Sequence, residues 1–151
     1  MKRAQRLEMV QRVVNDHERR RAEALASSEH RLVESEAKLR ELEHYQAGYA
    51  RDFALRAESG MDGALARDYQ AFLARLEEAL RQQTHAVTRA RALRDGELQN
   101  WQSAAQRAEA VGQMLRRFQI EEERAFDRRE QYESDERSQR SWCDAMVLRG
   151  A

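Results

Sequence analysis

The fold is decided by the stretch Asp68-Tyr-Gln-Ala-Phe-Leu-Ala-Arg-Leu-Glu-Glu-Ala-Leu-Arg-Gln-Gln83, in which large apolar residues recur every three or four positions. These residues are Tyr69, Phe72, Leu76 and Leu80, and Ala79 and Gln83 extend the same stripe. Spacings of three and four place side chains on one face of a helix, whereas a strand alternates between faces. The stretch is therefore predicted to be an amphipathic helix that packs against a partner.

The rest of the chain has a composition typical of long helices. Its 151 residues include no proline, six glycines and 36% charged residues, and it is rich in the strong helix formers Ala, Glu, Gln and Arg. Apolar residues are spread thinly, so each helix can bury only a narrow seam against one other helix. We therefore expect stability to come from helix length and helix association, in an elongated rod.

Apolar residues before this stretch predict a first coiled-coil helix. The expected seam consists of Leu7, Val10, Val14, His17, Arg21, Leu25, Ser28, Leu32, Ser35, Leu39, Leu42, Gln46, Tyr49 and Phe53. Steps of three and four follow one another along this seam, as a coiled coil requires. Two successive steps of four between His17 and Leu25 predict a stutter, at which the supercoil locally unwinds. Polar residues at Ser28, Ser35 and Gln46 weaken the seam, so this helix needs a partner.

The segment Glu58-Ser-Gly-Met-Asp-Gly63 is the clearest break in the pattern. Gly60 suits the left-handed position after a helix, and Asp62 suits the N-cap of the next one. Such a short connection joins antiparallel neighbours. The prediction is an all-α chain, a single antiparallel two-helix coiled-coil hairpin over residues 1–151. Its expected parts are a helix over about 5–58, a turn at 59–63, a longer second helix over about 64–140, and a frayed tail at 141–151.

The second helix is expected to pack through its own apolar stripe. The predicted inner residues are Leu65, Tyr69, Phe72, Leu76, Leu80, Val87, Leu98, Trp101, Val111, Leu115 and Phe118. Folding about Gly60 pairs positions whose numbers sum to about 122, which places Phe53 near Tyr69. The second helix would then continue beyond the last residue that the first helix can cover.

Composition argues against several functional classes. The 27 basic and 27 acidic residues are interleaved, whereas nucleic-acid binding draws its affinity from a basic excess. A single cysteine, Cys143, gives no internal disulfide and fits a reducing compartment. The basic N-terminus is not followed by an apolar signal region, and no run approaches the length of a membrane span. We expect a cytoplasmic protein.

The sequence offers no constellation suited to catalysis or to a cofactor. The four histidines are far apart and lack companions at metal-ligand spacing. Cys143 has no nearby histidine that could activate its thiol, and no phosphate loop or nucleophile elbow occurs. Two thin helices also provide no pocket that excludes water. We therefore expect no enzyme activity, no metal and no cofactor.

Aromatic residues gather near the expected hairpin tip. Tyr45, Tyr49 and Phe53 on the first helix should face Tyr69 and Phe72 on the second. One interpretation is that these rings supply the packing that the polar seam lacks. The other is that a two-helix layer leaves some rings exposed, as anchors for another protein.

Several stretches, in this order along the chain, resemble the flagellar type III export family FliJ. They are Arg6-Leu7-Glu8-x-Val10, Tyr45-Gln46-x-x-Tyr49, Tyr69-Gln-x-Phe72-x-x-x-Leu76-Glu77-x-Ala79-Leu80 and Glu130-Gln131-x-x-x-Asp135-Glu136. The resemblance covers nearly the whole length. It implies a hairpin similar to the γ stalk of rotary ATPases and to the injectisome stalk YscO.

The resemblance also implies partners and sites. The chain would link the hexameric export ATPase FliI to the cytoplasmic domain of the export gate FlhA, bind export chaperones, and associate peripherally with the inner membrane at the flagellar base. The implied gate-binding residues are Phe72, Leu76, Ala79 and Gln83. The implied ATPase contacts include Gln131, Asp135 and Glu136. Two alternatives remain, an injectisome stalk of a virulence system and a structural coiled coil that simply dimerises.

Overall fold

The computed structural model describes residues 3–150, which form two helices joined by a short turn. Helix α1 spans Arg3–Glu58 and helix α2 spans Gly63–Gly150, with 56 and 88 residues. No strand occurs within this described range. The all-α class and the longer second helix are therefore confirmed.

Helix α2 extends further than the sequence predicts. Residues 141–150, expected to be a frayed tail, continue the helix to Gly150. This segment contains good helix formers and has neither proline nor glycine before Gly150, so nothing in it ends the helix earlier. Met1, Lys2 and Ala151, which the predicted hairpin includes, lie outside the described residues.

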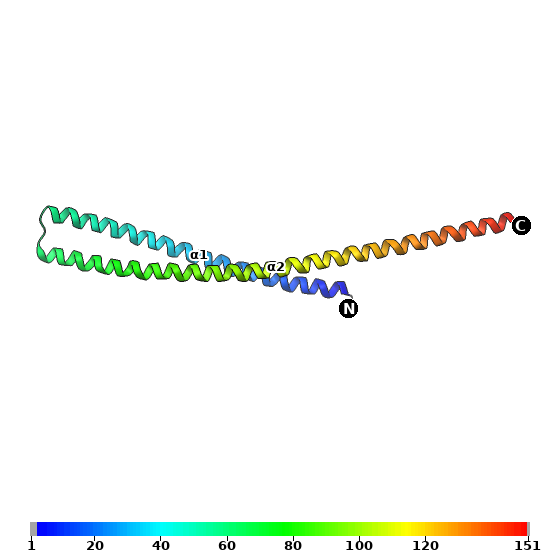
Figure 1. Cartoon of the computed structure of the whole chain (residues 1–151), viewed down its shortest axis with the longest axis horizontal. Coiled ribbons are helices and arrows are strands. Elements are labelled where there is room, and N and C mark those ends of the chain that lie inside the picture. Colours follow the sequence, from blue (N-terminus) through cyan, green and yellow to red (C-terminus); the bar gives the residue numbers. More distant parts are fainter. Residues whose placement is uncertain (1–2, 151) are drawn as a thin grey trace. The chain divides into compact units, whose positions relative to one another are not determined.

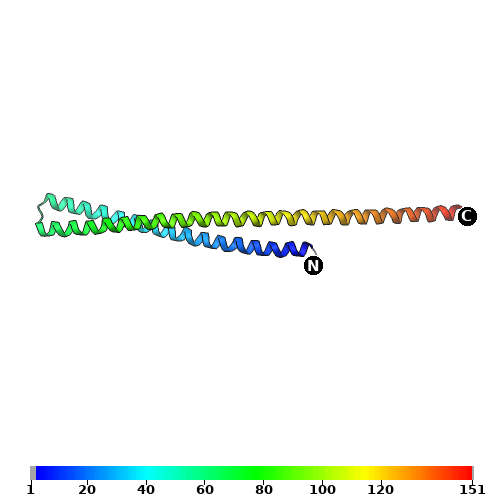
Figure 2. The ribbon, with the colours of Figure 1, turned by 60° about the horizontal axis from the view of Figure 1, so that its bottom comes forward.

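Packing between the helices divides the chain into two units. One unit comprises residues 17–104 and contains the turn, and the other contains residues 3–16 and 105–150 among those described. Within the unit 17–104, α1 and α2 run antiparallel and side by side from the turn (Figures 1 and 2). This arrangement confirms the predicted two-helix hairpin.

The turn has the backbone geometry that its glycine permits. Gly60 has a φ of +91°, the left-handed region that side chains with a Cβ rarely adopt. The Gly60 amide donates to the Ala57 carbonyl oxygen at 3.3 Å, which closes the last turn of α1. The Ala66 amide donates to the Asp62 carbonyl oxygen at 2.9 Å, so Asp62 occupies the N-cap position of α2. Both predicted cap positions are confirmed.

Replacing Gly60 by alanine is expected to destabilise the hairpin by about 1–2 kcal/mol, because a Cβ strains the left-handed backbone. Gly63→Ala is the matched control, since that glycine is helical and has open space around its Cβ position. The control should leave stability unchanged or raise it by up to about 1 kcal/mol. Urea denaturation followed by circular dichroism measures both variants. Equal effects at the two glycines would contradict the conformational explanation.

The seam of α1 follows a regular heptad pattern. Its buried and half-buried residues include Ala4, Leu7, Gln11, Val14, Glu18, Arg21, Leu25, Ser28, Leu32, Ser35, Leu39, Leu42, Gln46 and Phe53. From Ala4 to Gln46 these positions alternate steps of three and four, and Phe53 follows one heptad later, so the predicted stutter between His17 and Leu25 is wrong. Gln11 and Glu18 lie inward where Val10 and His17 were expected, and Val10 is 46% exposed. The prediction at Val10 is wrong because hydrophobicity favours this valine over the polar Gln11 beside it, whereas the heptad places Gln11 inward.

The seam of α2 has the same period. It consists of Ala66, Tyr69, Leu73, Leu76, Leu80, Gln83, Val87, Ala90, Arg94, Glu97, Trp101, Ala104, Ala108, Val111, Leu115 and Phe118. Leu65 and Phe72, predicted to lie inward, are 41% and 38% exposed. Leu73 takes the inward position because it follows Tyr69 by four residues, which the heptad requires. A prediction based on side-chain size alone is therefore wrong at Leu65 and Phe72.

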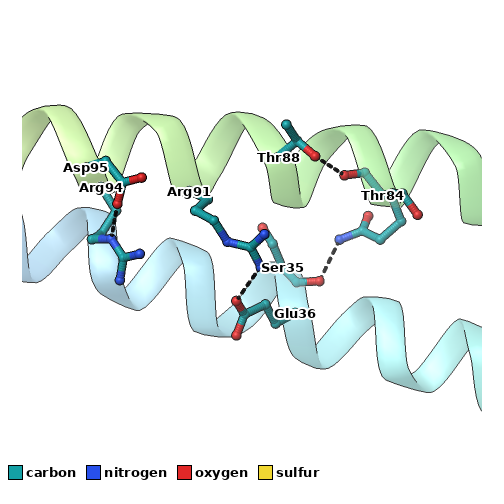
Figure 3. Close-up of polar contacts among 8 residues, drawn as sticks. Ser35, Glu36, Thr84, Thr88, Arg91, Arg94 and Asp95 are labelled. Atoms are coloured by element: carbon teal, nitrogen blue, oxygen red, sulfur yellow. Dashed lines mark hydrogen bonds and ion pairs between the residues drawn. The ribbon is translucent and has the colours of Figure 1, made fainter.

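Several polar residues in or beside the seam are paired with the backbone or with one another. The buried Ser28 hydroxyl donates to the Leu25 carbonyl oxygen at 2.8 Å within its own helix. The Gln83 amide donates across the hairpin to the Ser35 carbonyl oxygen at 2.9 Å, and Arg91 reaches Glu36 at 3.4 Å (Figure 3). Such hydrogen bonds offset the cost of removing polar groups from water. The seam is thus polar in composition without leaving these groups unsatisfied.

A second cluster of paired polar side chains lies farther from the turn in the unit 17–104. The Trp101 indole Nε1 donates to Glu18 Oε1 at 2.8 Å, and Arg21 pairs with Glu97 at 3.1 Å. All four side chains occupy seam positions of the two helices. The hydrogen bond from Trp101 explains why the heptad tolerates a glutamate at position 18.

Candidate protein-interaction face

Aromatic rings from both helices meet near the turn in two pairs. The ring centroids of Phe53 and Tyr69 lie 5.8 Å apart, and those of Tyr49 and Phe72 lie 4.8 Å apart with an interplanar angle of 64°. Both separations are typical of favourable aromatic contacts. The Phe53–Tyr69 pair confirms the register predicted from folding about Gly60.

The rings of the aromatic zone divide into packed and exposed ones, and their use as anchors for another protein stays a prediction. Phe53 and Tyr69 are half-buried seam residues, so their rings supply packing. Tyr45, Tyr49 and Phe72 are 50%, 40% and 38% exposed. The last three rings therefore remain at the edge of the hairpin, where a second molecule can reach them.

Tyr69 is held by a polar cluster on α1. Its hydroxyl donates to Asp52 Oδ2 at 2.8 Å, and the Arg56 guanidinium lies 5.7 Å from the centre of its ring. Arg56 Nε also pairs with Asp52 at 3.3 Å. The hydrogen bond to Asp52 raises the pKa of the Tyr69 hydroxyl, desolvation adds to that increase, and the charge of Arg56 opposes it.

A pH titration tests this hydrogen bond. Because the pKa of Tyr69 is raised in the folded chain, its contribution to stability is complete below the ordinary pKa of 10.0 and is lost as pH rises through the folded value. Tyr69→Phe is therefore expected to reduce stability at neutral pH, and the difference from the native chain should shrink in strongly alkaline solution. Urea denaturation at a series of pH values measures the difference.

A spectroscopic control accompanies this titration. As pH is raised, the tyrosinate absorbance of the native chain should include a component that appears at higher pH than the rest. The absorbance of Tyr69→Phe should lack this component. The exposed Tyr132→Phe serves as the matched control and should retain that component. A Tyr69→Phe titration curve that kept it would contradict the assignment.

The four residues implied for gate binding occupy different environments. Phe72 is exposed, whereas Leu76, Ala79 and Gln83 are half-buried in or beside the seam. The Gln83 side chain is engaged with the Ser35 carbonyl oxygen inside the hairpin. Of the four, Phe72 presents the largest apolar surface to solvent.

Two shallow depressions adjoin Tyr49. One, of about 240 Å³, is lined by Tyr49, Leu65, Asp68, Tyr69 and Phe72. The other, of about 280 Å³, is lined by His44, Tyr45, Gly48, Tyr49 and Asp52. We call these two depressions with their lining residues the aromatic face. Sequence reasoning missed Leu65 and Asp68 as surface residues of this face, because Leu65 had been assigned to the seam.

The residues of the C-terminal signature lie on α2 in the other unit. Gln131, Asp135 and Glu136 are all exposed, and Glu136 accepts an ion pair from Arg140 at 3.3 Å. The neighbouring Tyr132 and Trp142 are also exposed. These side chains are therefore accessible, and their predicted ATPase contact stays a prediction.

Over residues 3–150, no group of three or more His, Cys, Asp or Glu side chains is arranged to hold a metal ion. Cys143 is an exposed thiol. Neither α1 nor α2 contains, over the described residues, a segment apolar enough for its length to cross a bilayer.

Comparison with known proteins identifies a family. The family described as flagellar FliJ protein matches residues 1–146. No curated protein and no solved structure gave a significant match. The family consists of structural components of flagellar biogenesis and protein export. Because the match covers nearly all of the chain, this protein belongs to the flagellar FliJ protein family.

Proposed function

We propose that this chain is a non-enzymatic adaptor of the flagellar type III export apparatus that binds the cytoplasmic domain of the export gate FlhA. The observation that carries the proposal is the position of Phe72, which is 38% exposed while Leu73 occupies the seam. An aromatic ring that the fold leaves at an accessible edge is a common anchor of protein interfaces. The family membership supplies the export context.

The proposal includes further contacts and a location. The exposed residues Gln131, Asp135 and Glu136 of α2 contact the export ATPase FliI, so that one chain connects the ATPase to the gate. Export chaperones bind the same chain after delivering their cargo. The protein works in the cytoplasm, peripherally attached to the inner membrane at the flagellar base. The matching family is the flagellar one, which favours this system over an injectisome.

Isothermal titration of the FlhA cytoplasmic domain with the chain tests the gate contact. Phe72→Ala is expected to weaken binding at least about tenfold, the usual effect of removing an interface anchor. The single variant is preferred to a Phe72→Ala/Leu76→Ala double variant, because Leu76 also packs in the hairpin. Leu93→Ala, another exposed apolar residue on α2, is the matched control and should bind normally.

Two outcomes would overturn the gate contact. One is unchanged affinity of Phe72→Ala when circular dichroism shows native helix content. The other is a native dimer, detected by light scattering, that buries Phe72 against a second copy of the chain. The second outcome would favour the structural, dimerising coiled coil.

A pull-down with FliI tests the second contact separately. The double variant Asp135→Ala/Glu136→Ala is expected to lose ATPase binding while retaining gate binding, because these carboxylates lie in the other unit from Phe72. Glu121→Ala/Glu122→Ala removes two exposed charges from the same helix and serves as the control. Normal FliI binding by Asp135→Ala/Glu136→Ala would contradict this placement.

A further inference from the structure

The depression of about 240 Å³ between the helices combines three aromatic walls with a carboxylate. Tyr49, Tyr69 and Phe72 supply the rings, Leu65 adds an aliphatic wall, and Asp68 is the charged lining residue. Among the described residues, the Asp68 side chain takes part in no hydrogen bond or ion pair. The depression therefore contains an acidic group without an internal cation.

The neighbouring depression has the same charge character. His44, Tyr45, Gly48, Tyr49 and Asp52 line it, so neither depression has a lysine or an arginine in its wall. Asp52 is already engaged with Tyr69 and Arg56. Asp68 is thus the carboxylate of the aromatic face that remains available to a partner.

The chain itself shows which side chain suits such surroundings. Arg56 lies with its guanidinium 5.7 Å from the centre of the Tyr69 ring while it pairs with Asp52 at 3.3 Å. A guanidinium is attracted both by an aromatic face and by a carboxylate, and its apolar stem packs on neighbouring hydrophobic groups. The Tyr69 ring of the depression is already in contact with Arg56, whereas Phe72, Leu65 and Asp68 repeat the same components, an aromatic ring, an apolar surface and a carboxylate, without an arginine of this chain between them.

We propose that the depression lined by Tyr49, Leu65, Asp68, Tyr69 and Phe72 binds an arginine side chain of the export gate. The stem of that arginine packs between Leu65 and Phe72, and its guanidinium pairs with Asp68. This assignment rests on the proposed gate contact and deepens it. It makes Asp68 a specificity-determining residue, because a carboxylate selects a cationic anchor over a neutral apolar one.

Titration of the FlhA cytoplasmic domain into charge variants tests this assignment. Asp68→Asn is expected to weaken binding about fivefold to tenfold, and Asp68→Lys more than tenfold, because the reversal places two cations together. Glu77→Lys makes the same reversal at an exposed position of α2 outside the depression and should remain within about twofold of the native chain. Circular dichroism and thermal unfolding establish that each variant keeps its fold.

Salt dependence gives a second readout. Affinity of the native chain should fall as ionic strength rises, and this dependence should be shallower for Asp68→Asn, since one charge pair has been removed. Leu65→Ala should weaken binding without changing the salt dependence. This separation distinguishes an ionic contact from a purely apolar one.

The outcomes separate the two proposals. If Phe72→Ala loses affinity but Asp68→Lys binds within twofold of the native chain, the arginine site is wrong and the gate contact stands. If the native chain does not bind the gate domain, the gate contact and the arginine site are both overturned. Weakened binding of Asp68→Asn with unchanged salt dependence also counts against a cationic occupant.

Discussion

Replacing Leu32 by alanine is expected to lower the free energy of unfolding of the hairpin by about 2–3 kcal/mol. Leu32 is 6% exposed and lies in the seam of α1. Truncating a buried leucine removes its transfer free energy and leaves a cavity, at a cost of about 2–5 kcal/mol. The lower part of that range applies because a layer of two helices can collapse partly around the gap.

The adjacent Val33 provides the matched control for this prediction. Its side chain is 59% exposed, so Val33→Ala should change stability by less than about 0.5 kcal/mol. Urea unfolding can be followed by fluorescence of Trp101 in a Trp142→Phe background, because Trp101 belongs to the unit 17–104 and Trp142 does not. Equal destabilisation by Leu32→Ala and Val33→Ala would contradict the seam assigned to α1.

Enlarging Ala104 to leucine is expected to destabilise the chain by about 1–3 kcal/mol. Ala104 is 1% exposed and is the most buried residue described. A larger side chain at such a position must displace its neighbours or force strained rotamers, and overpacking of this kind costs about 1–3 kcal/mol. The larger apolar area of leucine would by itself suggest a gain in stability, since leucine is more hydrophobic than alanine.

Ala92→Leu is the matched control for this enlargement. Ala92 lies on the same helix and is exposed, and leucine is nearly as good a helix former as alanine. Thermal unfolding should show a lower midpoint for Ala104→Leu and little change for Ala92→Leu. A rise in the midpoint for Ala104→Leu would show that the seam has room at this position.

Much of the fold could be predicted because its signals are local. The absence of proline and the recurrence of apolar residues predict long helices, and Gly60 marks the place where the chain reverses. The conformation of Gly60 then follows from its missing Cβ. The register followed from the position of the turn, and the contact between Phe53 and Tyr69 confirms it.

Errors arose where two neighbouring positions competed for the seam. At Val10 and Gln11, and again at Phe72 and Leu73, hydrophobicity or size favours the first residue of the pair, but the heptad places the second one inside. Hydrophobicity of a single residue does not determine its direction on a helix. The phase of the whole seam, which is set jointly by both helices, decides it.

The candidate site was only partly predictable for the same reason. The sequence places aromatic residues on both sides of the turn, yet their division into packed and exposed rings depends on seam phase. The approach of Leu65 and Asp68 to Tyr49 requires residues from two helices to meet, and no local signal indicates it.

The sequence by itself determined the helices, the turn at Gly60 and the family, because propensity, spacing and motif are properties of the chain in order. The tertiary structure decided which face of each helix is covered. Glu18 can occupy a seam position because Trp101 donates a hydrogen bond to its carboxylate. Phe72 lies outside the seam because Leu73 occupies the heptad position. The exposed aromatic face is therefore a consequence of how two helices share one narrow interface.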